Sequence, residues 1–419
     1  ECRLGSTGVD WQGVAAVLER ATRELRLAVG RASAAQRLRW VAAAPEQVDA
    51  DAWREALSDL RQALEQVLEA LDTVSELAPD FVRLHERAMA MAGRIDRFLA
   101  PCEPGCVRWV DVGLQLRLVE SPLDIAEAVR GKLLKAQPVA AGAEEEPPWR
   151  DEGQEGEAPP PRRTWVFTSA TLGDDQRLSW FTEPCGLDDA EVLRVGSPFD
   201  YPSQAALYLP RQLPKPSDPA HSPAVARLAA AGALRLGGRT MVLTTTLRAL
   251  RTIGEELARA LPDGCGIEVL VQGQWPKRRL IERFRAGTEA GAGCVLVASA
   301  SFWEGVDVPG EALQLVLIDK LPFPPPGDPL VEARSQRLEA QGRNPFNDYF
   351  IPEAAVALKQ GAGRLIRRES DRGVLVVCDT RLGTMGYGRR LLAALPAMRR
   401  LQSEEEFREA LDDLREVSA

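Results

Sequence analysis

Short apolar runs alternate with longer amphipathic runs through the second half of the chain. The pattern predicts strands at 240–243 and 267–271, and helices at 247–260 and 277–285. Strands connected by helices lie parallel in one sheet, because the crossover returns the chain to the end where it started. We therefore expect an α/β fold from about residue 205 onward, with a parallel sheet and helices on both of its faces.

A motif of the form Gln-x-x-Gly-Arg-x-x-Arg occupies residues 360–367, directly before a strand-like run at 373–378. On a helix its members would line one edge, since residues three or four positions apart share a face: Gln360, Gly363, Arg364 and Arg367. Two guanidinium groups on one edge suit a bound triphosphate, because each offers a planar fork of donors that matches phosphate oxygens. The plainer alternative is a solvated basic helix end, since acidic residues follow at 369 and 371.

Further motifs precede it, each beside an apolar run that predicts a strand. Ser-Ala-Thr at 169–171 follows a predicted strand at 165–168, and three threonines stand at 244–246, after another apolar run. Ser-Phe-Trp-Glu-Gly-Val-Asp-Val-Pro at 301–309 lies between two apolar runs, and Asp-Lys-Leu-Pro-Phe at 319–323 follows the second. A turn between buried strands places carboxylates and backbone N–H groups at a sheet edge, where α/β proteins bind ligands.

In this order the motifs resemble helicase motifs III, IV, V and VI of superfamily 2, in its XPD/DinG-like branch. The sequences of segments 301–309 and 319–323 are similar to those of the bacterial DinG/YoaA type. The resemblance covers roughly residues 105 to 400. It implies RecA-like motor domains and an ATP-dependent DNA helicase. Such an enzyme would move 5′ to 3′ along single-stranded DNA in repair or replication.

The resemblance also implies roles for individual residues. Catalytic contacts to the γ-phosphate or to a water would come from Gln360, Arg364 and Arg367. Contacts to the nucleotide would come from Glu304, Gly305, Asp307 and Gly363, although Asp307 is open to a second interpretation as a turn cap. Contacts to DNA would come from Ser169, Thr171, Thr244, Thr245, Thr246, Arg248 and Gln272. Aromatic residues are candidates either for base stacking or for core packing: Trp275, Phe302, Trp303 and Phe323.

The implied cofactor is ATP with Mg²⁺, but only part of a nucleotide site is visible. Neither Gly-x-x-x-x-Gly-Lys-[Ser/Thr] nor Asp-Glu-x-His occurs in the 419 residues. We therefore expect the C-terminal part of a longer helicase, a partial motor that is inactive alone. No metal site is expected in this chain. An iron–sulfur cluster needs four thiolates, and only Cys102 and Cys106 stand close together, so we expect any cluster in a preceding N-terminal segment.

Three regions are expected along the chain. Residues 1–105 form a helical region that resembles the family's arch by position. Residues 106–204 are the C-terminal part of the first RecA-like motor domain, and residues 205–419 are the second. Within the middle region, 137–163 is rich in Pro, Glu and Gly. This segment is expected to be either a disordered loop or an acidic tract that binds a partner.

Finer elements are predicted within the first two regions. Apolar residues recur at steps of three and four through 10–100, which predicts helices arranged as a bundle or hairpin. Alternation at 108–112 and 114–118 predicts a β-hairpin around Gly113. A Ser-Pro pair opens a predicted helix at 121–134.

The composition bounds location and partners. A net charge of −9 argues against a protein that coats DNA over its whole surface, but it permits a local basic groove. No apolar run reaches the length of a membrane span, and seven scattered cysteines suit a reduced cytosol. We expect a monomer in the bacterial cytoplasm, associated with the nucleoid, whose partners are single-stranded or forked DNA and replication or repair proteins. His85 and His221 are expected at the surface.

Three other functions stay open. A module that binds single-stranded DNA or a partner without hydrolysis would agree with the incomplete nucleotide motifs. A fragment of a helicase–exonuclease fusion would share the same motor. A nucleotide-binding α/β enzyme of another class would carry the motifs by chance.

Overall fold

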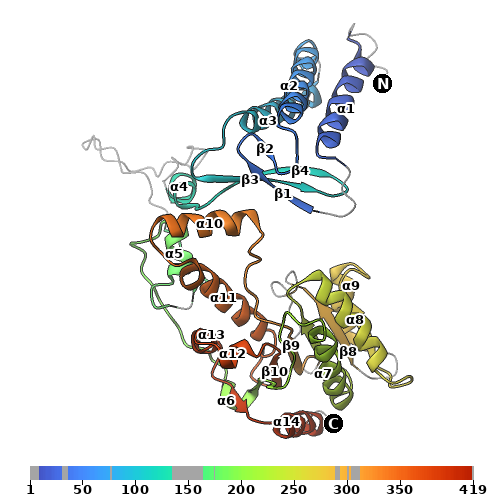
Figure 1. Ribbon diagram of the computed structural model, residues 1–419, viewed down its shortest axis with the longest axis vertical. Coiled ribbons are helices and arrows are strands. Elements are labelled where there is room, and N and C mark those ends of the chain that lie inside the picture. Colours follow the sequence, from blue (N-terminus) through green and yellow to red (C-terminus); the bar gives the residue numbers. More distant parts are fainter. Residues whose placement is uncertain are drawn as a thin grey trace, which may run out of the picture. The chain divides into compact units, whose positions relative to one another are not determined.

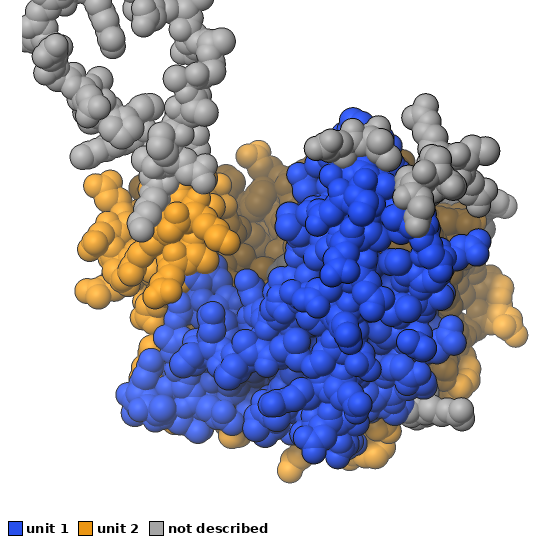
Figure 2. Space-filling model, turned by 90° about the horizontal axis from the view of Figure 1, so that it is seen from above, with its two compact units in different colours: residues 1–125, 325–342 blue, residues 126–324, 343–419 orange. Residues whose placement is uncertain are grey.

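The computed structural model describes residues 9–30, 36–75, 78–134, 164–173, 175–287, 293–299, 302 and 312–417. The chain divides into two compact units (Figure 2). Unit 1 holds residues 1–125 and 325–342, and unit 2 holds 126–324 and 343–419. These boundaries differ from those expected at 105 and 204, because the hairpin near Gly113 and a later helix both lie in unit 1.

Unit 1 is built on an antiparallel sheet with strand order β2-β1-β3-β4. Its strands are β1 (Gln36–Val41), β2 (Ala44–Pro45), β3 (Cys106–Val112) and β4 (Leu116–Pro122). The predicted hairpin is confirmed, because β3 and β4 pair in antiparallel register on either side of Gly113.

Three helices pack with this sheet: α1 (Trp11–Ala28), α2 (Ala50–Asp72) and α3 (Pro79–Leu99). Asp10 and Asp49 begin α1 and α2, each accepting a backbone N–H in the first turn. The expected helices are therefore confirmed here, but the expectation is wrong at β1. There Leu38 pairs with Val110 of β3, so a long-range ladder outweighs the local helical pattern.

The helix α10 (Pro329–Ala340) also belongs to unit 1, although it follows a strand of unit 2 in sequence. Arg37 forms ion pairs with Asp111 of β3 and with Asp328, the N-cap of α10. Arg39 pairs with Glu332 at 2.8 Å. Ion pairs therefore attach α10 to β1 and β3.

Unit 2 contains a seven-stranded sheet with order β11-β5-β10-β9-β6-β8-β7. Every pair in it is parallel. The strands are β5 (Ala205–Tyr208), β6 (Thr240–Leu243), β7 (Glu268–Val271), β8 (Cys294–Ala298), β9 (Leu315–Ile318), β10 (Gly373–Val377) and β11 (Arg399–Leu401). The expected α/β class with a parallel sheet is confirmed.

Helices cover both faces of this sheet (Figure 1). One face shares a core with α7 (His221–Leu236), α8 (Leu247–Ala260) and α14 (Glu404–Val417). The other packs against α9 (Lys277–Ala286), α11 (Ile351–Ala362), α12 (Arg381–Thr384) and α13 (Gly388–Ala394). The central strands are buried on both faces, as in sheets whose strands read as continuous apolar runs.

Short helical segments complete unit 2: α4 (Ala126–Ala128), π-helices at Val129–Leu134 and Phe346–Phe350, α5 (Ser179–Cys185) and α6 (Tyr201–Gln204). The helix predicted at 121–134 thus begins five residues late, at Ala126, because Ser121 and Pro122 continue β4 in its pairing with β3.

The strand predicted at 165–168 is wrong. Residues 164–168 form no ladder in the described part of the chain, and Val166 is 78% exposed. A strand needs a neighbour for its backbone hydrogen bonds, and neither described sheet offers one to this segment. The loop expected at 137–163 lies outside the described residues. None of the described helices combines the length and the apolar character that crossing a membrane requires.

Candidate functional site

Polar residues gather at one edge of the unit 2 sheet, where four neighbouring strands end. Thr244 follows β6, Ser299 follows β8, and Asp319 follows β9. Asp379 stands just beyond β10. Because the strands are parallel and adjacent in the order β10-β9-β6-β8, these residues lie along the edge where open α/β sheets bind ligands.

The turn from β6 into α8 holds the three threonines of motif IV, which differ in exposure. Thr244 is buried, and its N–H and hydroxyl both donate to the carbonyl of Ala298. Thr246 is exposed and begins α8, its hydroxyl oxygen accepting the N–H of Ala249 at 3.1 Å. Arg248, in the first turn of α8, is also exposed. The solvent-facing groups of this turn are therefore the Thr246 hydroxyl and the Arg248 side chain, with Thr245 half-buried.

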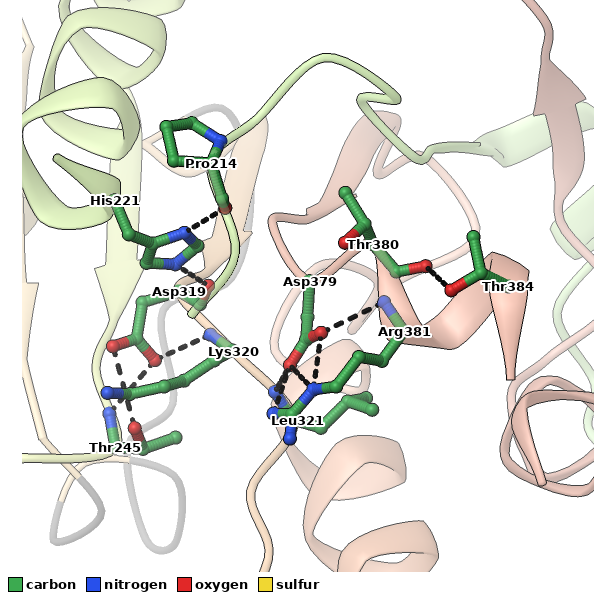
Figure 3. A network of polar contacts seen from close by, with 10 residues as sticks. All are labelled: Pro214, His221, Thr245, Asp319, Lys320, Leu321, Asp379, Thr380, Arg381 and Thr384. Atoms are coloured by element: carbon green, nitrogen blue, oxygen red, sulfur yellow. Dashed lines mark hydrogen bonds and ion pairs between the residues drawn. The ribbon is translucent and has the colours of Figure 1, made fainter. Parts of the chain in front are cut away.

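Asp319 links this turn to the end of β9 (Figure 3). Its carboxylate accepts the N–H of Thr245 at 3.0 Å and that of Lys320 at 2.7 Å. Burial of the side chain raises the pKa of Asp319 to about 6. The charges of Lys320 and His221 and the two backbone N–H groups work against that rise.

His221, at the start of α7, contacts the backbone of Asp319. Its Nε2 lies 2.9 Å from the carbonyl oxygen of Asp319, and its Nδ1 lies 2.9 Å from that of Pro214 (Figure 3). The expectation of a surface histidine is wrong, because His221 is only 1% exposed at the start of α7. An amphipathic pattern could not show this, since the burial arises from packing of α7 over the strand ends. His85 is partly exposed and lies 2.9 Å from Asp72.

Asp379 organises the neighbouring strand end in the same way (Figure 3). Its carboxylate accepts the N–H of Leu321 at 2.9 Å and holds the guanidinium of Arg381, which lies 5.8 Å from the centre of the Phe323 ring. Phe323 packs against the core and against Tyr387. The Asp-Lys-Leu-Pro-Phe segment is therefore held by one buried carboxylate at each of two strand ends.

Gln272 follows β7 and contacts the end of β8. Its side-chain oxygen accepts both the N–H and the hydroxyl of Ser299, at 2.7 and 3.0 Å. Gln272 is half-buried. This arrangement gives Gln272 a local role in holding the segment where the chain leaves β8.

Motif VI spans the end of α11 and the loop that leads to β10. Only its first three residues are helical, because α11 ends at Ala362 and Gly363 is the C-cap. The expectation that all four members line one helix edge is therefore wrong for Arg364 and Arg367. Both are half-buried in the loop, where Arg364 Nε donates to the Gln360 carbonyl at 3.3 Å.

The loop of motif VI is stabilised by Asp371. Its Oδ2 accepts the backbone N–H groups of Arg367 and Arg368, at 2.8 and 2.9 Å. Asp371 is 6% exposed. In the sequence, Asp371 favours the alternative of a solvated basic helix end. In the structure its carboxylate accepts backbone N–H groups and so shapes the turn.

Motifs III and VI meet within unit 2. The Nε2 of Gln360 lies 3.5 Å from the hydroxyl of Thr171. Ser169 in turn accepts the N–H of Thr171 at 3.1 Å and is exposed. Ser-Ala-Thr and the arginine motif, far apart in sequence, are thus brought side by side.

Most of motif V falls outside the described residues, including Glu304, Gly305, Asp307 and Trp303. Phe302 is described and is 2% exposed, with the Nζ of Lys277 4.9 Å from its ring centre. This favours core packing over base stacking for Phe302. Trp275 packs partly against the core, and Arg279 lies 4.7 Å from its ring centre.

Among the described residues, no three His, Cys, Asp or Glu side chains cluster in a way that could hold a metal ion. Cys102 and Cys106 are free thiols, and the Cys102 thiol donates to the Cys106 carbonyl at 3.5 Å. Burial raises the pKa of both thiols, which opposes the thiolate form that iron–sulfur ligation needs.

Sequence reasoning missed Asp319, Asp379 and His221 as parts of the edge. A signal was present for the two carboxylates, since each directly follows a buried strand whose end should lie at the ligand-binding edge. The burial of His221 had no such signal.

Comparison with known proteins identifies a domain and a group of relatives. Residues 233–398 match the helicase C-terminal domain family. The chain is 35% identical to the ATP-dependent DNA helicase YoaA of Escherichia coli over 338 residues, which cover 78% of this chain and 48% of YoaA. It is 38% identical to the ATP-dependent helicase DinG of Mycobacterium tuberculosis over 266 residues, which cover 62% of this chain and 38% of DinG.

A solved XPD helicase structure aligns with a TM-score of 0.46 and 12% sequence identity, covering 94% of this chain and 62% of that one. The chain spans about half the length of the curated YoaA relatives it matches. The family match lies on the parallel-sheet unit that carries motifs IV to VI. The chain therefore carries a helicase C-terminal domain and is similar to the YoaA and DinG helicases.

Proposed function

We propose that this chain is part of an ATP-dependent DNA helicase and supplies its second motor domain. In that domain, Arg364 and Arg367 of motif VI would line one side of the nucleotide site. The observation that carries the proposal is the approach of Gln360 to Thr171, which joins two helicase motifs in one place. The YoaA and DinG relatives, named as ATP-dependent helicases, support it from sequence.

The residues of motif VI fit a polyphosphate. Arg364 and Arg367 lie half-buried on a loop whose backbone is held by Asp371, so the two guanidinium groups are offered from a fixed turn. Guanidinium forks bind phosphate oxygens and stabilise the charge that develops during phosphoryl transfer. When bound, ATP would supply the free energy of hydrolysis. Among the described residues, no cluster of carboxylates that could hold Mg²⁺ is found.

DNA contact is assigned to the β6–α8 turn and to motif III. Thr246 and Arg248 are exposed at the start of α8, where N–H groups and a guanidinium can hold a phosphate. Thr171 stands beside Gln360, and Ser169 contacts Thr171, so the pair would couple the nucleotide site to the DNA. Thr245 and Gln272 act through backbone and strand-end contacts, and Thr244 anchors the turn from a buried position. Glu304, Gly305, Asp307 and Gly363 remain assigned to the nucleotide.

The resemblance to the DinG and YoaA helicases supports a wider proposal about direction of movement, substrate and location. The protein would move 5′ to 3′ on single-stranded DNA, act on single-stranded or forked DNA in repair or replication, and work as a monomer with the bacterial nucleoid in the cytoplasm. The part of the motor in this chain would not hydrolyse ATP alone.

Substitution of Arg364 tests the nucleotide assignment. In a protein extended N-terminally through a phosphate-binding loop, Arg364→Ala is expected to lower DNA-stimulated ATP hydrolysis by about a thousandfold, because one transition-state charge contact is lost. Arg368→Ala is the matched control, since Arg368 is exposed and its Asp371 bond uses the backbone N–H. Equal rates for the two variants would sink the assignment of Arg364.

A further inference from the structure

We propose that Asp319 is a positioning residue for DNA binding, which sets the β6–α8 turn in the conformation that presents Thr246 and Arg248 to a phosphate. The inference rests on the proposed function, since the DNA contact of this turn belongs to it. Asp319 itself touches no DNA in this account, because its side chain is fully buried.

The turn is held from within at consecutive residues. The backbone N–H of Thr244 donates to Ala298 at 2.7 Å, and that of Thr245 donates to the Asp319 carboxylate at 3.0 Å. The Thr245 hydroxyl also lies 3.5 Å from Oδ2 of Asp319. The next residue, Thr246, begins α8. Asp319 therefore fixes the last peptide before the exposed groups that would meet the phosphate.

Asp319 is itself held on its other side. The same Oδ1 atom accepts the N–H of Lys320 at 2.7 Å, and the Asp319 carbonyl lies 2.9 Å from Nε2 of His221 (Figure 3). The other ring nitrogen of His221 faces the Pro214 carbonyl at 2.9 Å. His221 thus braces the β9 end from the start of α7.

Burying a carboxylate costs free energy unless its oxygens accept hydrogen bonds. Here they accept the backbone N–H groups of Thr245 and Lys320, which follow two neighbouring strands. The charged and titratable groups facing it are Lys320, His221 and the buried thiol of Cys378, which follows β10. A hydrophobic residue would leave the Thr245 N–H without its acceptor, and the turn would be free to move.

Two substitutions separate the position of the acceptor from its charge. Asp319→Ala removes the acceptor and is expected to weaken binding of a fluorescently labelled oligo(dT) by about tenfold, as for the loss of a buried hydrogen bond. Asp319→Asn keeps Oδ1 for both N–H groups and is expected to bind within about threefold of wild type. Hydrogen exchange in the peptide that covers 244–248 is expected to quicken in the Ala variant only.

Asp379→Ala is the matched control, because Asp379 is buried at the next strand end and holds Leu321 and Arg381 but not Thr245. It is expected to keep the oligo(dT) affinity and the slow exchange of 244–248. The proposal is overturned if Asp319→Ala binds like wild type, if Asp319→Asn loses as much affinity as the Ala variant, or if Asp379→Ala loses as much as Asp319→Ala. Failure of wild-type protein to bind oligo(dT) would instead refute the DNA assignment of this turn and the inference with it.

Discussion

Single buried residues order the carboxyl edge of the unit 2 sheet. Asp319 and Asp379 each collect backbone N–H groups from the segment that follows a strand, and His221 adds a brace from α7. The sequence shows that Asp319 and Asp379 each follow an apolar run that predicts a strand. It does not show their hydrogen-bond partners Thr245 and Leu321, because these are distant in sequence. Thr246 and Arg248 are exposed at the same edge.

Ionisation of Asp319 is expected to reduce stability as pH rises. Its pKa is raised to about 6, above the ordinary value of 3.8. The folded state therefore favours the protonated form, so the penalty is absent below pH 3.8, develops between about 4 and 6, and is complete above. At 1.36 kcal/mol for each pKa unit, it approaches about 3 kcal/mol at pH 7.

Asp319→Asn removes this titration. Urea unfolding from pH 4 to pH 7 is expected to show the variant gaining stability relative to wild type, with the difference growing through that window. A difference that stays constant with pH would show that Asp319 does not titrate as described.

Gly238 is expected to tolerate no side chain. Its φ is +101°, and a Cβ there would lie 2.3 Å from the backbone carbonyl carbon of Gly293, where the loops before β6 and β8 cross. Gly238→Ala should lower the free energy of unfolding by several kcal/mol, roughly 3 or more, since backbone must move. Gly237→Ala is the control. Gly237 has a φ of +65° but open space around it, so only conformational strain of about 1 kcal/mol is expected. Equal losses in urea unfolding would contradict this.

At the scale of elements, continuous patterns predicted structure well and isolated ones did not. The alternation of strands and helices predicted β6 and α8 to the residue, because buried parallel strands and amphipathic helices carry strong local periodicity. β1 was missed because its partner β3 lies far along the chain. The strand predicted at 165–168 failed because an apolar run makes a strand only beside another strand.

Within the candidate site the same distinction holds. The motifs predicted which segments would come to one edge, and Thr171 and Gln360 do meet. Motif VI was expected on a helix, but Gly363 ends α11 and puts both arginines on a loop. A short motif fixes residue spacing, whereas the end of a helix depends on the packing of the chain around it.

The start of α8 depends on its N-cap. Thr246 accepts the N–H of Ala249, which otherwise lacks a partner in the first turn. Thr246→Ala is expected to lower the free energy of unfolding by about 1 kcal/mol, and Thr246→Ser, which keeps the hydroxyl, by much less. The two variants are compared by urea unfolding. A loss as large for Ser as for Ala would show that the methyl group, not the cap, stabilises the turn.

At the scale of the whole molecule, the chain combines two units with different architectures. Unit 2 carries the parallel sheet and the helicase motifs described above, while unit 1 carries an antiparallel sheet with its own helical core. The helix α10 belongs to unit 1 but leads, through the chain, toward α11 and motif VI.

We propose that this chain supplies the motif VI arginines of an ATP site but not its phosphate loop. The rate of ATP hydrolysis, with and without single-stranded DNA, is to be measured for this chain and for a protein extended N-terminally through a phosphate-binding loop. We expect that only the extended protein hydrolyses ATP and that DNA accelerates the reaction. Hydrolysis by the present chain alone would refute the proposal and require a different phosphate-binding element within these residues.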